Sequence, residues 1–269
     1  MSKPPRDLPP KNAIDRFIRR FHGLAHLVAV LLLYAIAALG LGLALAPALW
    51  LGDRARALAA PLTGWSHWLA LGLGGGVCFF VFGFALLAVV VVLNWLLPTR
   101  FAAFRGSYYT LAAVPWFVHN ALFYLVRFTI LPFFTFTPIG FWFLRAMGMK
   151  IGRGTLVNSE YFSDLRFLTL GENVAVGGSV RIFAHYGGGG RLTIAPVEIG
   201  DRVTLGLGCT VMGDVVIGDG ATILPHSVLL PGSRVGEGEV WGGVPARLIP
   251  REEMERFKEG IHGVRSRTE

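Results

Sequence analysis

Charged residues are scarce in this chain. Asp, Glu, Lys and Arg make up 16% of its 269 residues, whereas an ordinary soluble domain carries about 25%. Apolar residues make up 53%, and four long stretches, 21–52, 57–99, 106–126 and 128–144, contain none of the four charged types. Beyond residue 150 the composition is that of a soluble protein rich in Gly and Val. A single soluble domain does not fit this distribution, and we expect two parts that meet near Gly148–Gly152.

Cysteine is almost absent as well. Cys78 lies in an apolar stretch and Cys209 in the Gly- and Val-rich part, so neither a disulfide framework nor a metal-ligand spacing is present, and no metal is expected. The net charge is +8, but many of the cations flank apolar stretches rather than forming a recognisable nucleic-acid module. We therefore expect no nucleic-acid partner.

Two apolar stretches are long enough to cross a bilayer. His22–Leu51 and Ser66–Leu97 each exceed the roughly 20 helical residues that cross the hydrocarbon core. The first stretch is too long for a cleavable signal peptide, so we expect it to be retained. The next apolar region, Gly106–Arg145, is interrupted by Arg127, Pro132 and Pro138. It fits two further spans, a re-entrant pair or helices lying in the membrane plane, and we favour at least one interfacial element.

The distribution of cations predicts an orientation. Cations are in excess before the first stretch and after the second, and the segment between them carries Arg54 and Arg56 partly offset by Asp53. Because cytoplasmic flanks are enriched in Lys and Arg, both outer flanks should be cytoplasmic. The sequence thus predicts a multi-pass protein of the cell inner membrane whose part beyond residue 150 faces the cytoplasm.

An aliphatic residue recurs every six positions in the second part. The uninterrupted series is Ile199, Leu205, Val211, Ile217, Ile223, Leu229 and Val235. A period of six fits neither an α-helix nor a simple strand, but it fits a triangular solenoid in which three short strands, one hexapeptide each, make one coil. We expect about five coils of a left-handed parallel β-helix, with Gly relieving the turns. The predicted organisation is a helical membrane-anchoring domain, 1–148, an all-β domain, 149–250, and a C-terminal helix and tail, 251–269.

The repeat breaks between Ile182 and Ile199, whose spacing is one position short of three hexapeptides. A break of this kind predicts a loop outside the prism, where functional residues concentrate. His185 stands at its start, and Gly187–Gly190 predicts a mobile or tightly turned continuation. A neutral imidazole accepts a proton near pH 7, which makes His185 a candidate general base.

These features resemble the hexapeptide-repeat acyltransferases, such as the galactoside, serine and xenobiotic acetyltransferases, over about residues 150–250. The resemblance rests on the repeat, the loop-borne His and the terminal segment Trp241–Ile249. It implies that His185 takes a proton from an acceptor hydroxyl or amine, which attacks the acyl thioester of coenzyme A. It also implies a homotrimer with active sites between neighbouring prisms. The residues that it places on the coenzyme A path are Gly206, Pro225, Trp241 and Arg247.

A second resemblance covers both halves. The junction FLRAMGMKIGR and the ending GEVWGGVPAR are similar to the membrane-bound C-terminal domain of ε-poly-lysine synthetase-like enzymes. That likeness leaves open amide formation from a carrier-bound aminoacyl donor, in place of transfer, most simply of acetyl, from coenzyme A. A non-catalytic membrane scaffold is a third hypothesis. A β-helix carbonic anhydrase is disfavoured, because only His185 and His226 lie in the repeat and three His ligands are needed.

Other polar residues remain candidates. Asp164 precedes Ile182 by three hexapeptides, so it should lie one coil below the loop, where it would orient His185 or bind a cationic acceptor. His226 follows Pro225 at a coil corner, Glu160 lies in an irregular first coil, and His119–Asn120 is an acceptor-site candidate within an apolar stretch. The acceptor's identity, whether saccharide, lipid-linked, peptide or another small molecule, is open. The apolar half favours one that lies at the bilayer.

Overall fold

The computed structural model describes residues 13–250, 252, 253 and 255. It divides into two compact units. The first contains the chain up to Phe134 together with Pro138–Met147 and Gly189–Leu192, and the second contains Thr135–Thr137, Gly148–Gly188 and the chain from Thr193 onward. Glu252, Glu253 and Glu255 are helical, and the rest of the predicted C-terminal helix and tail lies outside the described residues.

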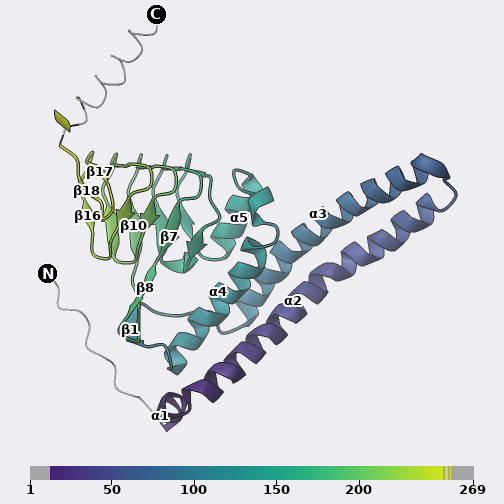
Figure 1. Cartoon of the computed structure of the whole chain (residues 1–269), viewed down its shortest axis with the longest axis horizontal. Coiled ribbons are helices and arrows are strands. Elements are labelled where there is room, and N and C mark those ends of the chain that lie inside the picture. The colour runs from purple at the N-terminus through teal and green to yellow at the C-terminus, as the bar shows by residue number, and fades with distance from the viewer. Residues whose placement is uncertain (1–12, 251, 254, 256–269) are drawn as a thin grey trace, which may run out of the picture. The chain divides into compact units, whose positions relative to one another are not determined.

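Two long apolar helices dominate the first unit (Figure 1). After the short helix α1 (Ala13–Arg20), α2 runs from His22 to Ala59 and α3 from Gly64 to Leu96. Both predicted stretches are therefore helical, and Pro47 lies inside α2 without ending it. By length and composition both could span a membrane, since each contains a stretch of 18 residues whose mean hydropathy is high, 2.6 in α2 and 3.0 in α3.

Glycines let the first unit pack closely. A Cβ at Gly74 of α3 would lie 2.7 Å from the Cβ of Ala55 on α2, and one at Gly83 would lie 2.4 Å from the side chain of Ile130. A larger residue at Gly74 would push α2 and α3 apart, and one at Gly83 would require the Ile130 side chain to move. The Phe79 ring adds an edge-on contact to Phe133, 5.3 Å between centroids.

The region after α3 consists of short elements. They are β1 (Phe104–Ser107), η1 (Leu111–Ala113), α4 (Val114–Arg127), η2 (Leu131–Phe133) and α5 (Pro138–Ala146). The breaks expected at Arg127 and Pro138 are thus confirmed. The longest of these helices, α4, rises only about 21 Å, which is short of the ~30 Å core. Among the described residues, two further spans through this region are therefore not found.

The second unit is a parallel β-helix, and its six-residue period is that of the left-handed form (Figure 1). One face has the strand order β16-β13-β10-β5-β2, the second β18-β17-β14-β11-β6-β3 and the third β15-β12-β7-β4. Five parallel strands on each of two faces agree with the predicted five coils. The strands are β2 (Lys150–Ile151), β3 (Leu156–Val157), β4 (Phe162–Ser163), β5 (Leu168–Leu170), β6 (Ala175–Val176), β7 (Arg181–Phe183), β10 (Val197–Ile199), β11 (Thr204–Leu205), β12 (Thr210–Val211), β13 (Val215–Ile217), β14 (Thr222–Ile223), β15 (Val228–Leu229), β16 (Arg234–Val235), β17 (Val240–Gly242) and β18 (Arg247–Leu248), the last antiparallel to β17.

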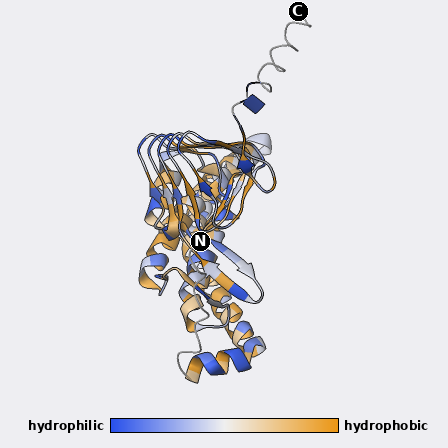
Figure 2. Cartoon of the chain, turned by 90° about the vertical axis from the view of Figure 1, so that its left-hand side faces the viewer, coloured by the Kyte–Doolittle hydropathy of each residue, from blue (hydrophilic) through white to orange (hydrophobic). Residues whose placement is uncertain are grey.

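The aliphatic residue of each hexapeptide points into the prism. Ile199 pairs with Ile217, Leu205 with Ile223 and Val211 with Leu229, and all of these side chains are buried. Burial of each contributes about 1.5–3 kcal/mol relative to exposure, and only neighbouring coils supply the contacts. In Figure 2 the coils alternate between hydrophobic and hydrophilic colours, as this inward and outward alternation requires.

The turns between strands share a backbone conformation that the sequence pattern does not predict. The residue three positions after the inward aliphatic has a positive φ at ten turns, for example Arg202, Gly208, Asp214 and His226. The glycine directly after the aliphatic has another function, because a Cβ at Gly206 would lie 2.5 Å from the backbone nitrogen of Pro225 in the next coil. The prediction that these glycines relieve the turn is therefore wrong: they allow the coils to stack closely.

Candidate active site

The break in the repeat is an ordered hairpin. In a regular coil, two strands lie between a strand and its partner in the next coil, as β11 and β12 lie between β10 and β13. Between β5 and its partner β10 there are four strands, so this coil contains two more than a regular one. The additional strands are β8 (His185–Gly188) and β9 (Arg191–Ile194). Gly189 and Gly190, both with positive φ, connect them as a tight two-residue turn requires. The expected loop is therefore a hairpin, closed by a 2.8 Å hydrogen bond from Ala195 N to Ala184 O.

His185 lies at the first residue of this hairpin, three positions after the inward Ile182. At regular turns the equivalent residue has a positive φ, but His185 begins strand β8 instead. Its Nδ1 lies 2.6 Å from Oδ2 of Asp164. The Asp164 side chain is fully buried and the His185 side chain is 26% exposed. The pair therefore holds a carboxylate inside the protein and presents an imidazole at the surface.

The register of the first coil brings the two residues together. Phe162 pairs with Ile182 and Ser163 with Phe183, an offset two positions longer than three hexapeptides. Asp164 therefore lies beside Ala184 and next to His185, in the adjacent coil, as predicted. A strict 18-residue spacing would have placed it beside Ile182 instead. Its own φ is +61°, a left-handed conformation that Asp tolerates better than most residues, and helix η3 (Leu165–Phe167) follows it.

Two neighbours of this pair were not singled out from the sequence. The ring of Phe183 lies 6.1 Å from the His185 ring, and Ser163 is fully buried beside Asp164. The signal that locates them is the pairing of β4 with β7, and this pairing is hidden because the first coil departs from the strict period.

The residues implied for coenzyme A lie along one edge of the β-helix. Gly206 follows β11, Pro225 follows β14, and Trp241 lies in β17, where it pairs with Ile223. Arg247, exposed on β18, pairs with Gly242. These four residues therefore lie on the face that contains β11, β14, β17 and β18, either in its strands or in the turns that follow them.

Within one chain, however, this edge and His185 belong to different corners of the prism. Gly206 and Pro225 lie where the chain passes from the β11–β14 face to the β12–β15 face. His185 lies where it leaves the face of β7 and β12 toward β10. One copy of the chain does not bring the two groups of residues together.

A carboxylate braces the last coil. Oε2 of Glu239 accepts hydrogen bonds from Trp241 Nε1, at 2.8 Å, and from the backbone N–H of Gly236, at 2.6 Å. These bonds, the Trp241 bond foremost, lower the pKa of Glu239. Trp241 is therefore held in a fixed orientation beside the terminal segment.

The other sequence candidates are dispersed. His226 is an exposed residue with φ +57° at a coil corner, where its ring occupies the space left by Gly208. Glu160 lies at the irregular first coil. In the first unit His119 and Asn120 are buried: His119 Nδ1 lies 2.9 Å from Asn94 Oδ1, and Asn120 donates to Trp116 O. Among the described residues, no group of three His, Cys, Asp or Glu side chains could hold a metal.

The β-helix contains the region that matches a known protein family. Residues 196–231 match the family "Bacterial transferase hexapeptide (six repeats)". The chain is 33% identical over 141 residues to "Putative acetyltransferase YvoF" of Bacillus subtilis, covering 49% of this chain and 81% of that protein. It is 31% identical over 128 residues to the delta-poly-L-ornithine synthetase of Acinetobacter baumannii, covering 45% of this chain but 9% of the synthetase.

Other matches are shorter or structural. The matched region spans 44% of a Dictyostelium discoideum relative that is 31% identical, and 26% of the gamma carbonic anhydrase 2 of Arabidopsis thaliana, which is 40% identical over 73 residues. Among solved structures, the hexapeptide-repeat acetyltransferase VCA0836 of Vibrio cholerae is 23% identical. That match covers 39% of this chain and 63% of VCA0836, with a TM-score of 0.36.

Three findings indicate the same family: the match to the hexapeptide model, the six-residue series of inward side chains, and the likeness to YvoF over 81% of that protein. The chain belongs to the bacterial hexapeptide-repeat transferase family.

Proposed function

We propose that this protein is a membrane-anchored acyltransferase that moves an acyl group, most simply acetyl, from coenzyme A to a hydroxyl or amine of a membrane-proximal acceptor. The observation that carries the proposal is the 2.6 Å contact between His185 Nδ1 and the buried Asp164 carboxylate. Family membership supports acyl transfer in general. Donor, acceptor and residue roles belong to the proposal.

His185 acts as the general base. An ionised carboxylate can only accept hydrogen bonds, so Asp164 selects the tautomer that carries its proton on Nδ1. Nε2 then bears the lone pair. It removes the proton of the acceptor O–H or N–H while the acceptor attacks the thioester carbonyl carbon. The tetrahedral intermediate collapses, the C–S bond breaks, and the coenzyme A sulfur leaves and takes up a proton.

The donor path runs along the edge that carries Gly206, Pro225, Trp241 and Arg247. Arg247 is exposed and would pair with the nucleotide phosphates. Because this edge and His185 occupy different corners of one prism, a complete site needs a second copy, whose edge faces the first copy's His185. A cyclic homotrimer supplies such a site at each of its three interfaces.

The two long apolar helices of the first unit support the proposed location. We place α2 and α3 across the inner membrane with 149–250 in the cytoplasm, where coenzyme A thioesters are found. The domain limits 1–148, 149–250 and 251–269 belong to this proposal. The acceptor in this proposal is a molecule held at the bilayer, because the chain is anchored there.

A second candidate is amide formation from a carrier-bound aminoacyl donor. The match to the delta-poly-L-ornithine synthetase favours it, because this chain aligns with part of an enzyme named for the synthesis of poly-ornithine. The same base would deprotonate the acceptor amine in either reaction. A scaffold without catalysis is the remaining hypothesis.

Donor binding separates these functions. Purified full-length protein in detergent is titrated with acetyl-coenzyme A and, separately, with an aminoacylated carrier protein. We expect acetyl-coenzyme A to bind and to be slowly hydrolysed. Loss of a charge-assisted contact in Arg247→Gln should weaken binding about 10- to 150-fold. Arg202→Gln, which removes an exposed arginine at another corner, should leave it unchanged.

Absence of acetyl-coenzyme A binding would refute the proposal. Binding of the carrier protein in its place would establish the second candidate, and binding of neither donor would leave the scaffold.

A further inference from the structure

Helix α1 has one apolar and one basic face. At 100° per residue, Ile14 and Phe17 fall on one side and Arg16 and Arg20 on the other, and Phe21, the residue after the helix, extends the apolar side. The apolar side chains are 56%, 53% and 46% exposed, so the described part of the chain leaves this face largely uncovered. A basic amphipathic helix with exposed aromatic residues is typical of an element that lies in the membrane interface.

An apolar groove continues this face along α2. A cavity of about 640 Å³ is lined by side chains of α1, α2 and α4, among them Phe17, Leu24, Leu39 and Phe117. None of its lining residues is charged. From Leu24 to Leu39 the helix rises about 22 Å, which exceeds the roughly 15 Å of hydrocarbon in one leaflet. The groove is therefore long enough for a lipid acyl chain.

Polar side chains lie at one side of this groove. A second cavity of about 340 Å³ shares walls such as Ala29 and Phe117 with the first, and it adds His26, Tyr108 and Tyr109. The rings of His22 and Tyr109 lie 5.4 Å apart, which fixes Tyr109 beside α2. These side chains supply hydrogen-bond donors next to an apolar slot.

The charge around this site is positive. Asp15 is the only acidic residue of α1; it is buried and accepts hydrogen bonds from the N–H of Leu111, at 3.0 Å, and from Thr110 Oγ1, at 3.2 Å. Arg16 and Arg20 remain exposed. An anionic headgroup therefore complements this end of the groove, and a zwitterionic one does so less well.

We propose that α1, the first half of α2 and α4 form a binding site for an anionic phospholipid. One acyl chain fills the groove, the phosphate receives hydrogen bonds from the His26 and Tyr109 side, and Arg16 and Arg20 supply the attraction. The site lies wholly in the first unit. The inference goes beyond acyl transfer and does not depend on His185.

The test measures lipid binding to the purified full chain in non-ionic detergent by native mass spectrometry. Phosphatidylglycerol is compared with phosphatidylcholine of the same acyl chains, and with glycerol phosphate, which has no chain. We expect one phosphatidylglycerol to bind in preference to phosphatidylcholine, and glycerol phosphate not to compete. Replacing both arginines, Arg16→Gln with Arg20→Gln, should reduce that preference about fivefold for each cation.

Two matched variants test the groove. Ala29 and Leu27 are both exposed on α2, but only Ala29 lines the cavities. Ala29→Trp should fill the groove and lower phosphatidylglycerol binding by more than tenfold, whereas Leu27→Trp should not.

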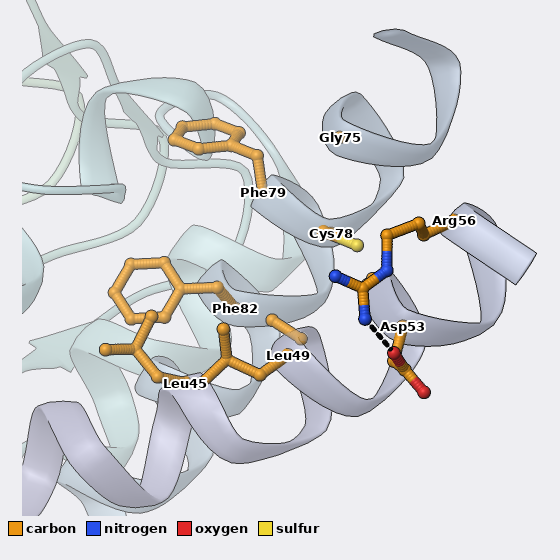
Figure 3. A pocket seen from close by; sticks show the side chains of 10 residues that line it. Leu45, Leu49, Asp53, Arg56, Gly75, Cys78, Phe79 and Phe82 are labelled. Carbon is orange, nitrogen blue, oxygen red and sulfur yellow. Dashed lines mark hydrogen bonds and ion pairs between the residues drawn. The ribbon is translucent and has the colours of Figure 1, made fainter. Parts of the chain in front are cut away.

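Arg56→Gln controls for the loss of a cation elsewhere on α2. Arg56 lies in a separate pocket between α2 and α3, where it pairs with Asp53 at 2.6 Å near Cys78 (Figure 3). This variant should keep the lipid preference.

Equal binding of the two lipids by the unmodified protein would overturn the proposal. Equal effects of Ala29→Trp and Leu27→Trp would do the same, as would competition by glycerol phosphate, which would indicate a phosphate site without a lipid. No acyl donor is present, so failure here is distinguishable from failure of the acyltransferase proposal.

Discussion

Asp164 is the residue whose position most needs an explanation. Its carboxylate is fully buried, and burial of such a group costs several kcal/mol unless hydrogen bonds replace its water. It also occupies a left-handed conformation. The 2.6 Å contact with His185 supplies a partner at the surface side. A carboxylate held this way fixes the orientation of the imidazole, and we treat it as a positioning residue.

Asp164→Asn tests this role, because Asn keeps the shape and tolerates the left-handed conformation. Loss of a charged hydrogen bond is worth about 1.5–3 kcal/mol, so kcat should fall about 10- to 150-fold. KM for acetyl-coenzyme A should stay unchanged, because the buried Asp164 contacts the imidazole of His185 and is not one of the residues proposed to hold the donor.

Steady-state kinetics check this prediction. Asp201→Asn is the control, since Asp201 is another turn carboxylate that accepts a backbone hydrogen bond, from Glu172. A fall in kcat of equal size in both variants would show that Asp164 is merely structural.

The sequence located His185 because a break in a strict period is visible by counting. The sequence also predicted that Asp164 and His185 lie in adjacent coils, but it assumed that the first coil has a regular length of three hexapeptides. The true offset between β4 and β7 exceeds three hexapeptides by two positions, because the first coil carries extra residues whose pairing only the structure reveals. Phe183 and Ser163 could not be placed beside the pair for the same reason.

At the level of elements, the six-residue period predicted the β-helix and its inward side chains correctly. It could not assign the turn conformation, because Arg202, Gly208, Asp214 and His226 share one conformation without sharing a residue type. The break in the period predicted a loop outside the prism, but it could not show that the inserted residues form the paired strands β8 and β9.

The last coil gives a test at this scale. Because hydrogen bonds lower the pKa of Glu239 from its ordinary 4.5, its ionised form stabilises the fold above that pH. The contribution is lost as pH falls through the lowered value. Glu239→Gln should therefore reduce the unfolding midpoint at neutral pH, and the difference from the unmodified protein should shrink near pH 3.

Thermal unfolding at the two pH values checks this prediction, with Glu237→Gln, an exposed residue of the same turn, as control. A difference that persists unchanged in acid would show that the carboxylate charge is not responsible.

At the scale of the whole molecule, the sequence predicted an apolar helical part and a β-helix part. The two long helices and the solenoid are both present. For the region 106–145 the sequence does not select one arrangement, because its Pro and Arg interruptions fit several; the structure shows short elements there. Orientation in a membrane stays a prediction from the distribution of cations.

Cysteine labelling tests that orientation. Thr63→Cys, at the connection between α2 and α3, should react with an impermeant maleimide in intact spheroplasts, whereas Glu198→Cys, exposed on β10, should react only after lysis. The maleimide should label the native Cys209 only slowly, because burial raises the pKa of its thiol to about 12 and the thiolate is the reactive form. Labelling of Glu198→Cys in intact spheroplasts would place the β-helix on the opposite side.

The chemistry proposed for the whole molecule depends on His185 as the base of an acyl transfer. The most direct measurement is turnover of acetyl-coenzyme A by the purified full chain, comparing the unmodified protein with His185→Ala and with Arg202→Gln, which removes an exposed side chain at a corner away from the donor edge. We expect all three to bind acetyl-coenzyme A equally and only His185→Ala to lose turnover, by about 10²- to 10⁴-fold. Unchanged turnover in His185→Ala would contradict the proposed role of His185.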